Sequence, residues 1–185
     1  MKDRERMFGT RRFPFSLSLL LLVALFPHHL TAQSLPSMEA GARTGYIKTT
    51  SGEFTQSEAF AQQPLPYRCT LPRNWIAQSG IEMSAGVLMH EGEEMLVVAA
   101  GPVVSFTRPG AHWFIEVGSR PTLISERSMG ARDFGGPFQF TSHFSIGVIW
   151  RQLEIGYRIQ HISNARIYSD NDGINMNMLN IGWRF

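Results

Sequence analysis

The chain has 185 residues, with 17 Lys or Arg, 15 Asp or Glu and a formal net charge of +2. This length favours one domain, and the single cysteine, Cys69, excludes an internal disulfide framework and a multi-cysteine zinc site. No run of 18 consecutive apolar residues occurs, which excludes a transmembrane helix. Membrane-spanning β-strands remain compatible with this composition, because each such strand has a much weaker sequence signal than a transmembrane helix.

The first 32 residues are predicted to be a secretory signal peptide. Five basic residues precede a charge-free apolar stretch at 13–26, and Ala32 supplies the small residue needed before cleavage at Gln33. The apolar stretch is too short for an anchoring helix. Cleavage leaves residues 33–185, with 12 basic and 13 acidic residues and a net charge of −1. The basic character of the full chain therefore does not indicate nucleic-acid binding.

The rest of the chain is predicted to form short strands with alternating side-chain character. Each such segment has one apolar and one polar face, because successive side chains of a strand point to opposite faces. The alternation is clearest at 81–90, 113–118, 138–150, 153–160 and 179–185. Valines favour a further strand at 95–106. Two earlier strands are expected near 40–50 and 59–70, although part of 33–60 is also compatible with a periplasmic lead-in.

The connections between these segments differ in length. Residues 107–111 and 150–152 form tight turns, whereas 125–137 and 164–173 are long and polar. Short periplasmic turns and longer outer loops are typical of bacterial outer-membrane barrels. We therefore predict an all-β fold, an eight-stranded antiparallel transmembrane β-barrel formed by residues 33–185 and located in the bacterial outer membrane.

The charges on the polar face favour a membrane barrel over a soluble one. Five charged residues of balanced sign are expected to form ion pairs inside a narrow, sealed lumen: Glu82, Glu116, Glu154, Arg158 and Arg184. Tryptophans occur at strand ends, where aromatic girdles meet the membrane interface. The terminal Phe185 resembles the sorting signal of outer-membrane barrels. A soluble exported barrel stays open, since periodicity alone does not distinguish the inside from the outside.

A polar pair continues the apolar face of the strand at 153–163. His161 and Ser163 share the parity of the lipid-facing residues, and their Cβ atoms should lie roughly 6.5–7 Å apart. An imidazole nitrogen reaches a serine oxygen across that gap, which is the first requirement of a base-activated nucleophile. The next strand returns antiparallel, and the same parity brings Asn175 close to the pair, where its oxygen would orient the imidazole. The predicted site is His161, Ser163 and Asn175 on the outer wall.

A purely structural explanation of these residues stays open. A strand end that passes from lipid into water also carries His and Ser side chains, and Asp170, Asn171 and Asp172 are good turn formers. Cys69 has no neighbouring feature that supports a nucleophilic role. Three other histidines lack metal-ligand spacing and are expected to be structural or solvated: His90, His112 and His143.

The chain resembles the lipid A 3-O-deacylase family in three places: GYRIQHISNA at 156–165, NDGIN at 171–175 and the terminal WRF at 183–185. The resemblance is clearest over 138–185 and weakens through 79–125. It implies an eight-stranded outer-membrane barrel that hydrolyses the ester-linked acyl chain at the 3-position of lipid A, without a cofactor or metal. By this resemblance Ser163 is the nucleophile, His161 is its general base and Asn164 helps to stabilise the oxyanion.

The chain departs from this family at one site position. The best-studied members carry a glutamate as the third member of the site, whereas this chain has Asn175. An asparagine orients a histidine but supplies no negative charge to the imidazolium. Asp170 or Asp172 from the loop is the alternative partner of His161.

The resemblance also implies partners. Lipid A or lipopolysaccharide is the expected substrate and the outer leaflet the expected surroundings, with no nucleic acid and with a homodimer left open. Two other functions stay open: a non-catalytic adhesin or structural barrel, and an esterase that acts on phospholipids.

Overall fold

The computed structural model describes residues 37–185, and the predicted signal peptide at 1–32 lies outside them. Within this range eight strands are long: β1 (Glu39–Thr49), β2 (Gly52–Leu71), β3 (Trp75–His90), β4 (Glu93–Thr107), β5 (Trp113–Ile124), β8 (Phe138–Trp150), β9 (Leu153–Ser163) and β10 (Ile174–Arg184). Two short strands, β6 (Ser128–Met129) and β7 (Arg132–Asp133), form a small hairpin. A 3-10 turn, η2 (Pro72–Asn74), joins β2 to β3. No helix in the described range is long and apolar enough to cross a membrane.

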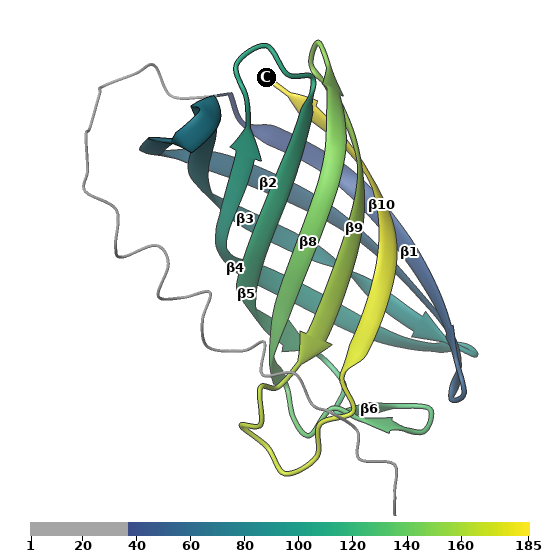
Figure 1. Cartoon of the computed structure of the whole chain (residues 1–185). Coiled ribbons are helices and arrows are strands. Elements are labelled where there is room, and N and C mark those ends of the chain that lie inside the picture. The colour runs from purple at the N-terminus through teal and green to yellow at the C-terminus, as the bar shows by residue number, and fades with distance from the viewer. Residues whose placement is uncertain (1–36) are drawn as a thin grey trace, which may run out of the picture.

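The eight long strands form one closed antiparallel barrel in the order β1-β10-β9-β8-β5-β4-β3-β2 (Figure 1). β1 closes the barrel against β10, with Glu39 opposite Arg184. Closure pairs the first strand with the last, so the barrel itself is not an open sheet. A lipid environment favours such closure, because lipid offers backbone groups no other hydrogen-bond partner. The predicted eight-stranded antiparallel barrel is confirmed.

The two ends of the barrel differ in their connections. The end that we call the loop end carries the turns 50–51 and 91–92 and the long connections 125–137 and 164–173. The opposite end, the turn end, carries the short connections 72–74, 108–112 and 151–152, and the chain terminates there. Figure 1 shows the C-terminus and β6 at opposite ends. The long connections thus share one end, as the sequence predicts.

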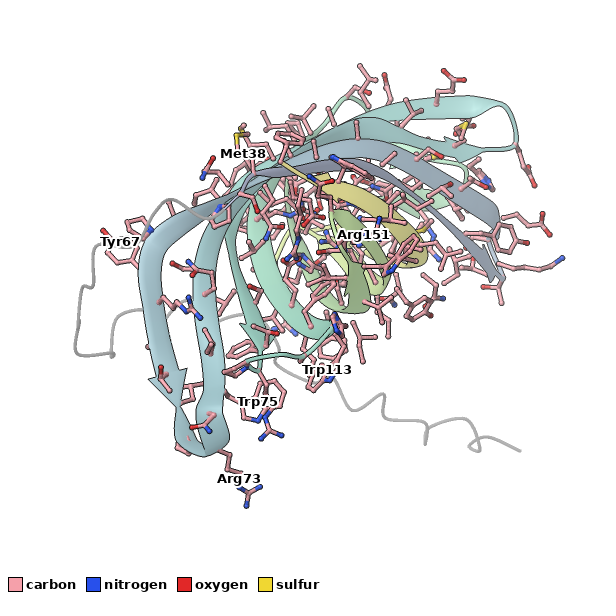
Figure 2. All side chains as sticks on the ribbon, turned by 90° about the horizontal axis from the view of Figure 1, so that it is seen from above. Met38, Tyr67, Arg73, Trp75, Trp113 and Arg151 are labelled. Carbon is pink, nitrogen blue, oxygen red and sulfur yellow. The ribbon has the colours of Figure 1, made fainter. Side chains whose placement is uncertain are left out.

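Two strands are longer than the sequence pattern indicates. β2 begins at Gly52 rather than near 59, and β3 begins at Trp75 rather than near 81. The register between them shifts between Pro64 and Arg68, and such a bulge hides the alternation of this stretch. The β2–β3 hairpin therefore extends beyond the barrel at the turn end (Figure 2). Because β1 begins at Glu39, any periplasmic lead-in ends before that residue.

The outer wall of the barrel is apolar. On β9 and β10 the odd-numbered residues between 155 and 183 are exposed, apart from half-buried Ser163, and the even-numbered ones are buried. Large apolar side chains that a soluble barrel would bury are between 49% and 63% exposed, among them Leu96, Leu123, Ile146, Ile155, Leu179 and Ile181. An apolar outer wall around a charged interior is typical of a membrane barrel and contradicts the soluble alternative.

Charged residues fill the middle of the lumen. Glu82 is fully buried, and its carboxylate accepts hydrogen bonds from Arg43 Nη2 at 2.6 Å, from Arg158 Nη2 at 2.9 Å and from Arg120. Arg158 also contacts Glu116 at 3.0 Å. Glutamate and arginine supply each other with the ionic hydrogen bonds that a buried charge requires, although Arg120 Nε has no hydrogen-bond partner among the described residues. The ion-pair network that the sequence predicts inside the lumen is therefore present.

The ion-pair network is larger than the sequence indicates. Its two remaining predicted members, Glu154 and Arg184, pair with each other near the turn end. Further members come from segments with weak or unassigned alternation: Glu39, Arg43, Glu58 and Arg120. His143, from the clearly alternating strand β8, also joins the network through Glu116.

The loop-end part of the lumen is apolar, unlike the charged interior that the sequence predicts. Met129 and Phe134, from the connection 125–137, are almost fully buried. They pack in one cluster with strand residues that point inward: Phe54, Leu88, Met95, Val97, Ile124, Ile162, Ile174, Met176 and Met178. The long connection therefore folds over the barrel mouth and fixes the inner faces of β9 and β10.

The four tryptophans all lie at the turn end. Trp75 and Trp113 begin β3 and β5, while Trp150 and Trp183 lie at the ends of β8 and β10. Indole rings have an apolar body and a polar N–H, which suits them to the membrane–water interface. The aromatic girdle expected from the sequence is therefore formed mainly at this end of the barrel.

Candidate active site

The three predicted site residues project from the outer wall near the loop end. His161 and Ser163 lie on β9 and Asn175 lies on β10, with His161 directly opposite Asn175 in the ladder. His161 and Asn175 are exposed, and Ser163 is half-buried. Their neighbours Ile162 and Ile174 point inward into the apolar cluster. Strand alternation and internal packing thus direct the polar side chains outward.

A hydrogen bond joins the histidine and the asparagine. His161 Nδ1 lies 2.8 Å from Asn175 Oδ1. An amide oxygen only accepts, so Nδ1 is the protonated nitrogen of the ring. The second nitrogen, Nε2, then carries a free lone pair and is able to accept a proton.

Gly173 brings the serine and the imidazole together. A Cβ added at Gly173 would lie 3.0 Å from Ser163 Cβ and 3.1 Å from His161 Cε1. The two side-chain atoms are therefore no more than 6.1 Å apart, the sum of these distances. Within residues 37–185 no hydrogen bond joins Ser163 to His161 directly, and catalytic hydrogen bonds of unliganded sites are often formed only once substrate is bound.

Asn164 follows the serine but is directed inward. It is fully buried, and its Nδ2 donates to the carbonyl oxygens of Phe134 at 2.8 Å and Asp170 at 2.5 Å. Its Oδ1 accepts a hydrogen bond from the backbone N–H of Arg166 at 2.8 Å. Both amide hydrogens are thus bound to loop carbonyls, and the side chain ties the connection 125–137 to the connection 164–173.

The two loop aspartates bind the β6–β7 segment rather than the histidine. Asp172 Oδ2 accepts a hydrogen bond from Asp133 N at 3.1 Å, and Asp170 pairs with Arg127 at 3.4 Å. Arg127 also donates to Asp133 at 3.0 Å. This hydrogen bond, together with one from the backbone N–H of Gly135, lowers the pKa of the Asp133 carboxyl below its usual value.

Arg132 links this segment to the site. Its Nη1 donates to the carbonyl oxygen of Gly173 at 2.9 Å, and its guanidinium lies 5.3 Å from the centre of the Phe54 ring. The β6–β7 hairpin thus holds the backbone of Gly173, the position where an added Cβ would meet both Ser163 and His161. Sequence reasoning missed Arg132 and Gly173. Of these two residues, only Gly173 has a recognisable sequence feature: it is the glycine of the NDGIN segment, directly before the strand that returns antiparallel to that of Ser163.

The other candidates stay outside this arrangement. His90 stacks on Phe54 with ring centres 4.2 Å apart, and buried His143 contacts Glu116 at 3.2 Å. Cys69 is half-buried in the extended hairpin at the turn end. No group of three or more His, Cys, Asp and Glu within residues 37–185 is arranged to hold a metal ion.

Comparisons with known proteins bear on this arrangement. Residues 65–184 match the family model of the lipid A 3-O-deacylase, PagL. Over 77 residues the chain is 32% identical to the lipid A deacylase PagL of Bordetella bronchiseptica. That match covers 41% of this chain and 43% of the relative, so it spans less than half of the relative's length.

The fold has a counterpart among solved structures. The barrel matches the crystal structure of the outer membrane enzyme PagL with a TM-score of 0.69 and 17% identity, over 80% of this chain and all of that chain. At 17% identity this structural similarity shows a shared fold and nothing about activity. The family model, in contrast, covers 120 of the 185 residues, including all of β9 and β10. The chain therefore belongs to the lipid A 3-O-deacylase (PagL) family and lies in the bacterial outer membrane.

Proposed function

We propose that the protein is a cofactor-free serine ester hydrolase that removes the ester-linked acyl chain at the 3-position of lipid A. The hydrogen bond between His161 and Asn175, on the apolar outer wall beside Ser163, is the observation that carries this proposal. Membership of the lipid A 3-O-deacylase family supports the substrate class. The relative from Bordetella bronchiseptica is itself named a lipid A deacylase.

The position of the site suits a lipid substrate. Each CH₂ group withdrawn from the bilayer costs about 0.8 kcal/mol, so an acyl ester of lipid A is best hydrolysed where it lies. The loop end faces the outer surface, since long loops of bacterial barrels are extracellular. A nucleophile on the lipid-facing wall near this end meets the outer leaflet at the depth where acyl esters begin.

The proposed chemistry uses one nucleophile and one base. Ser163 Oγ attacks the ester carbonyl carbon while His161 Nε2 takes the serine proton. The tetrahedral intermediate then collapses, the C–O bond to the sugar breaks, and His161 returns the proton to the sugar oxygen. Water, deprotonated by His161, then attacks the acyl-serine carbonyl carbon; the bond to Ser163 Oγ breaks, His161 returns the proton to Oγ, and the fatty acid is released. Asn175 keeps the imidazole in the tautomer that leaves Nε2 free.

The oxyanion role of Asn164 stays a prediction. Its amide hydrogens already bind two loop carbonyls, so donation to the substrate requires one of those bonds to be exchanged. The same contacts support a positioning role, because Asn164 fixes the loop that follows the nucleophile.

The experiment is the lipid A mass spectrum of cells that produce the protein. The native chain should remove one 3-linked acyl group, whereas Ser163→Ala and His161→Ala should leave lipid A intact. Equal barrel yield and heat-modifiable gel mobility provide the folding control. A profile that is unchanged by the native chain would favour an adhesin or structural barrel. Lysophospholipids in place of deacylated lipid A would favour an esterase acting on phospholipids.

A further inference from the structure

An apolar hollow lies on the outer wall at the turn end, at the opposite end of the barrel from Ser163. Its volume is about 410 Å³, within the range of small-molecule sites. The lining residues come from β2, η2, β3, β4 and β5: Leu71, Pro72, Trp75, Phe106 and Ile115. Phe106 and Ile115 are paired across the β4–β5 ladder, and Leu71 is paired with Trp75. The hollow exists because the β2–β3 hairpin extends past the barrel beside β4 and β5.

Aromatic rings border this hollow at the membrane interface. The rings of Trp75 and Trp113 meet edge to face, with centres 5.2 Å apart. Figure 2 shows the two side chains near each other beside the extended hairpin, whose tip carries Arg73. Indole rings mark the boundary between headgroups and acyl chains. The hollow therefore lies at the depth where the acyl chain of an inner-leaflet lipid meets its headgroup.

The rim of the hollow is cationic. Arg73 follows Pro72, and the pairing of Ile76 with Thr107 brings Arg108 to the level of Trp75. Both arginines are exposed, and neither belongs to any ion pair within residues 37–185. No Asp or Glu occurs at 63–81 or at 102–115. The positive charge of the rim is therefore not compensated by carboxylates of the surrounding strands, which suits it to a negatively charged ligand.

From these contacts we propose that the hollow binds a phospholipid with a negatively charged headgroup from the inner leaflet. An acyl chain fills the apolar hollow beside Trp75, and the phosphate binds the guanidinium groups of Arg73 and Arg108. Arginine suits this role because its planar donors match phosphate oxygens in pairs. A zwitterionic headgroup is disfavoured, since its ammonium group finds no carboxylate on this rim. The site is separate from the proposed catalytic residues and does not depend on their function.

The test uses tryptophan fluorescence in reconstituted vesicles. Trp150→Phe and Trp183→Phe together leave only Trp75 and Trp113 as reporters. The protein is placed in phosphatidylcholine vesicles that contain a small fraction of brominated phosphatidylglycerol or, in a parallel series, brominated phosphatidylcholine. We expect the brominated phosphatidylglycerol to quench at a lower fraction. Arg73→Gln and Arg108→Gln should each reduce this preference roughly fivefold, the effect of about one surface cation.

Arg151→Gln is the matched control. Arg151 is also an exposed arginine of the turn end, but it stacks over Trp150, 5.6 Å from the ring centre and away from the hollow. Its replacement should leave the preference unchanged. Soluble glycerol phosphate should not displace the lipid, because it has no acyl chain for the hollow. Equal quenching by the two brominated lipids, or a preference that survives both arginine substitutions, would overturn the proposal.

Discussion

His161 Nδ1 lies 2.8 Å from Asn175 Oδ1 across the β9–β10 ladder, on the wall of the barrel that faces lipid. The two residues come from strands joined by a ten-residue connection, and their inward neighbours Ile162 and Ile174 are fixed in the apolar cluster. The partner of the imidazole is thus a neutral amide, although a carboxylate is the partner in the best-studied family members.

Replacing Asn175 tests whether it orients the imidazole. Asn175→Ala removes the acceptor of the Nδ1 proton, and we expect kcat to fall on the order of 100-fold, as small misplacements of catalytic groups do. Asn175→Glu should preserve or raise kcat, because a carboxylate stabilises the imidazolium that forms during attack. Lipid A deacylation by purified protein in detergent measures both. A large loss in the glutamate variant, with the barrel folded, would show that Asn175 is not the orienting residue.

The space at Gly173 gives a second prediction. Gly173→Ala introduces a Cβ 2.8 Å from the backbone carbonyl oxygen of Ile162, 3.0 Å from Ser163 Cβ and 3.1 Å from His161 Cε1, so the strand backbone and both side chains must shift. We expect at least a tenfold loss of kcat in the folded fraction, roughly the cost of a displacement of some tenths of an ångström at a reacting group. Gly156→Ala on β9 is the control, since its added Cβ meets no atom closer than 3.4 Å. Equal losses in the two variants would contradict this explanation.

The strands that carry the site were predictable because their pattern is local. On β9 and β10 a period of two runs without interruption, so parity alone directs His161, Ser163 and Asn175 outward. The hydrogen bond to Asn175 follows from antiparallel pairing across one hairpin.

The contacts around the site were not predictable because they join distant loops. Arg132 lies 41 residues before Gly173, the residue whose carbonyl it binds, and no periodicity relates the two. The inward orientation of Asn164 depends on carbonyl groups of both long connections. The full length of the β2–β3 hairpin could not be predicted for another reason: the bulge after Pro64 interrupts the alternation of apolar and polar residues.

Arg132 gives a third prediction, about the loop that supports the site. Arg132→Gln shortens the side chain and removes its hydrogen bond to the Gly173 carbonyl, so the backbone beside Ser163 loses a fixed partner. We expect kcat to fall about tenfold, with a smaller loss in Arg132→Lys, which keeps the charge and one donor. Arg127→Gln in the same loop is the control, because the side chain of Arg127 is exposed and pairs with Asp133 and Asp170 rather than with Gly173. Kinetics with both variants at equal folded fraction distinguish the two arginines. An unchanged kcat in Arg132→Gln would mean that the backbone at Gly173 keeps its position without the hydrogen bond from Arg132.

The buried charge network gives a prediction about stability. Glu82→Gln leaves three arginine side chains, Arg43, Arg120 and Arg158, around a neutral amide in the middle of the lumen. Breaking a buried ion pair on one side costs about 3–5 kcal/mol, because the remaining charge stays desolvated. Urea-induced unfolding of the barrel in detergent should therefore shift to lower urea, while deacylation by the folded fraction stays normal, since Glu82 is on the inner face and the site is on the outer one.

Glu53→Gln provides the comparison for Glu82. Glu53 pairs with Lys48 at 2.7 Å on the exposed loop end, where water and salt screen the interaction, so its unfolding curve should match that of the native chain. If Glu82→Gln also unfolded at the native urea concentration, the arginines would have to be neutralised by other lumen carboxylates. Glu58 and Glu116, which already contact Arg43 and Arg158, would be those groups. The double variant Glu82→Gln with Glu116→Gln would then reveal the cost that the single variant concealed.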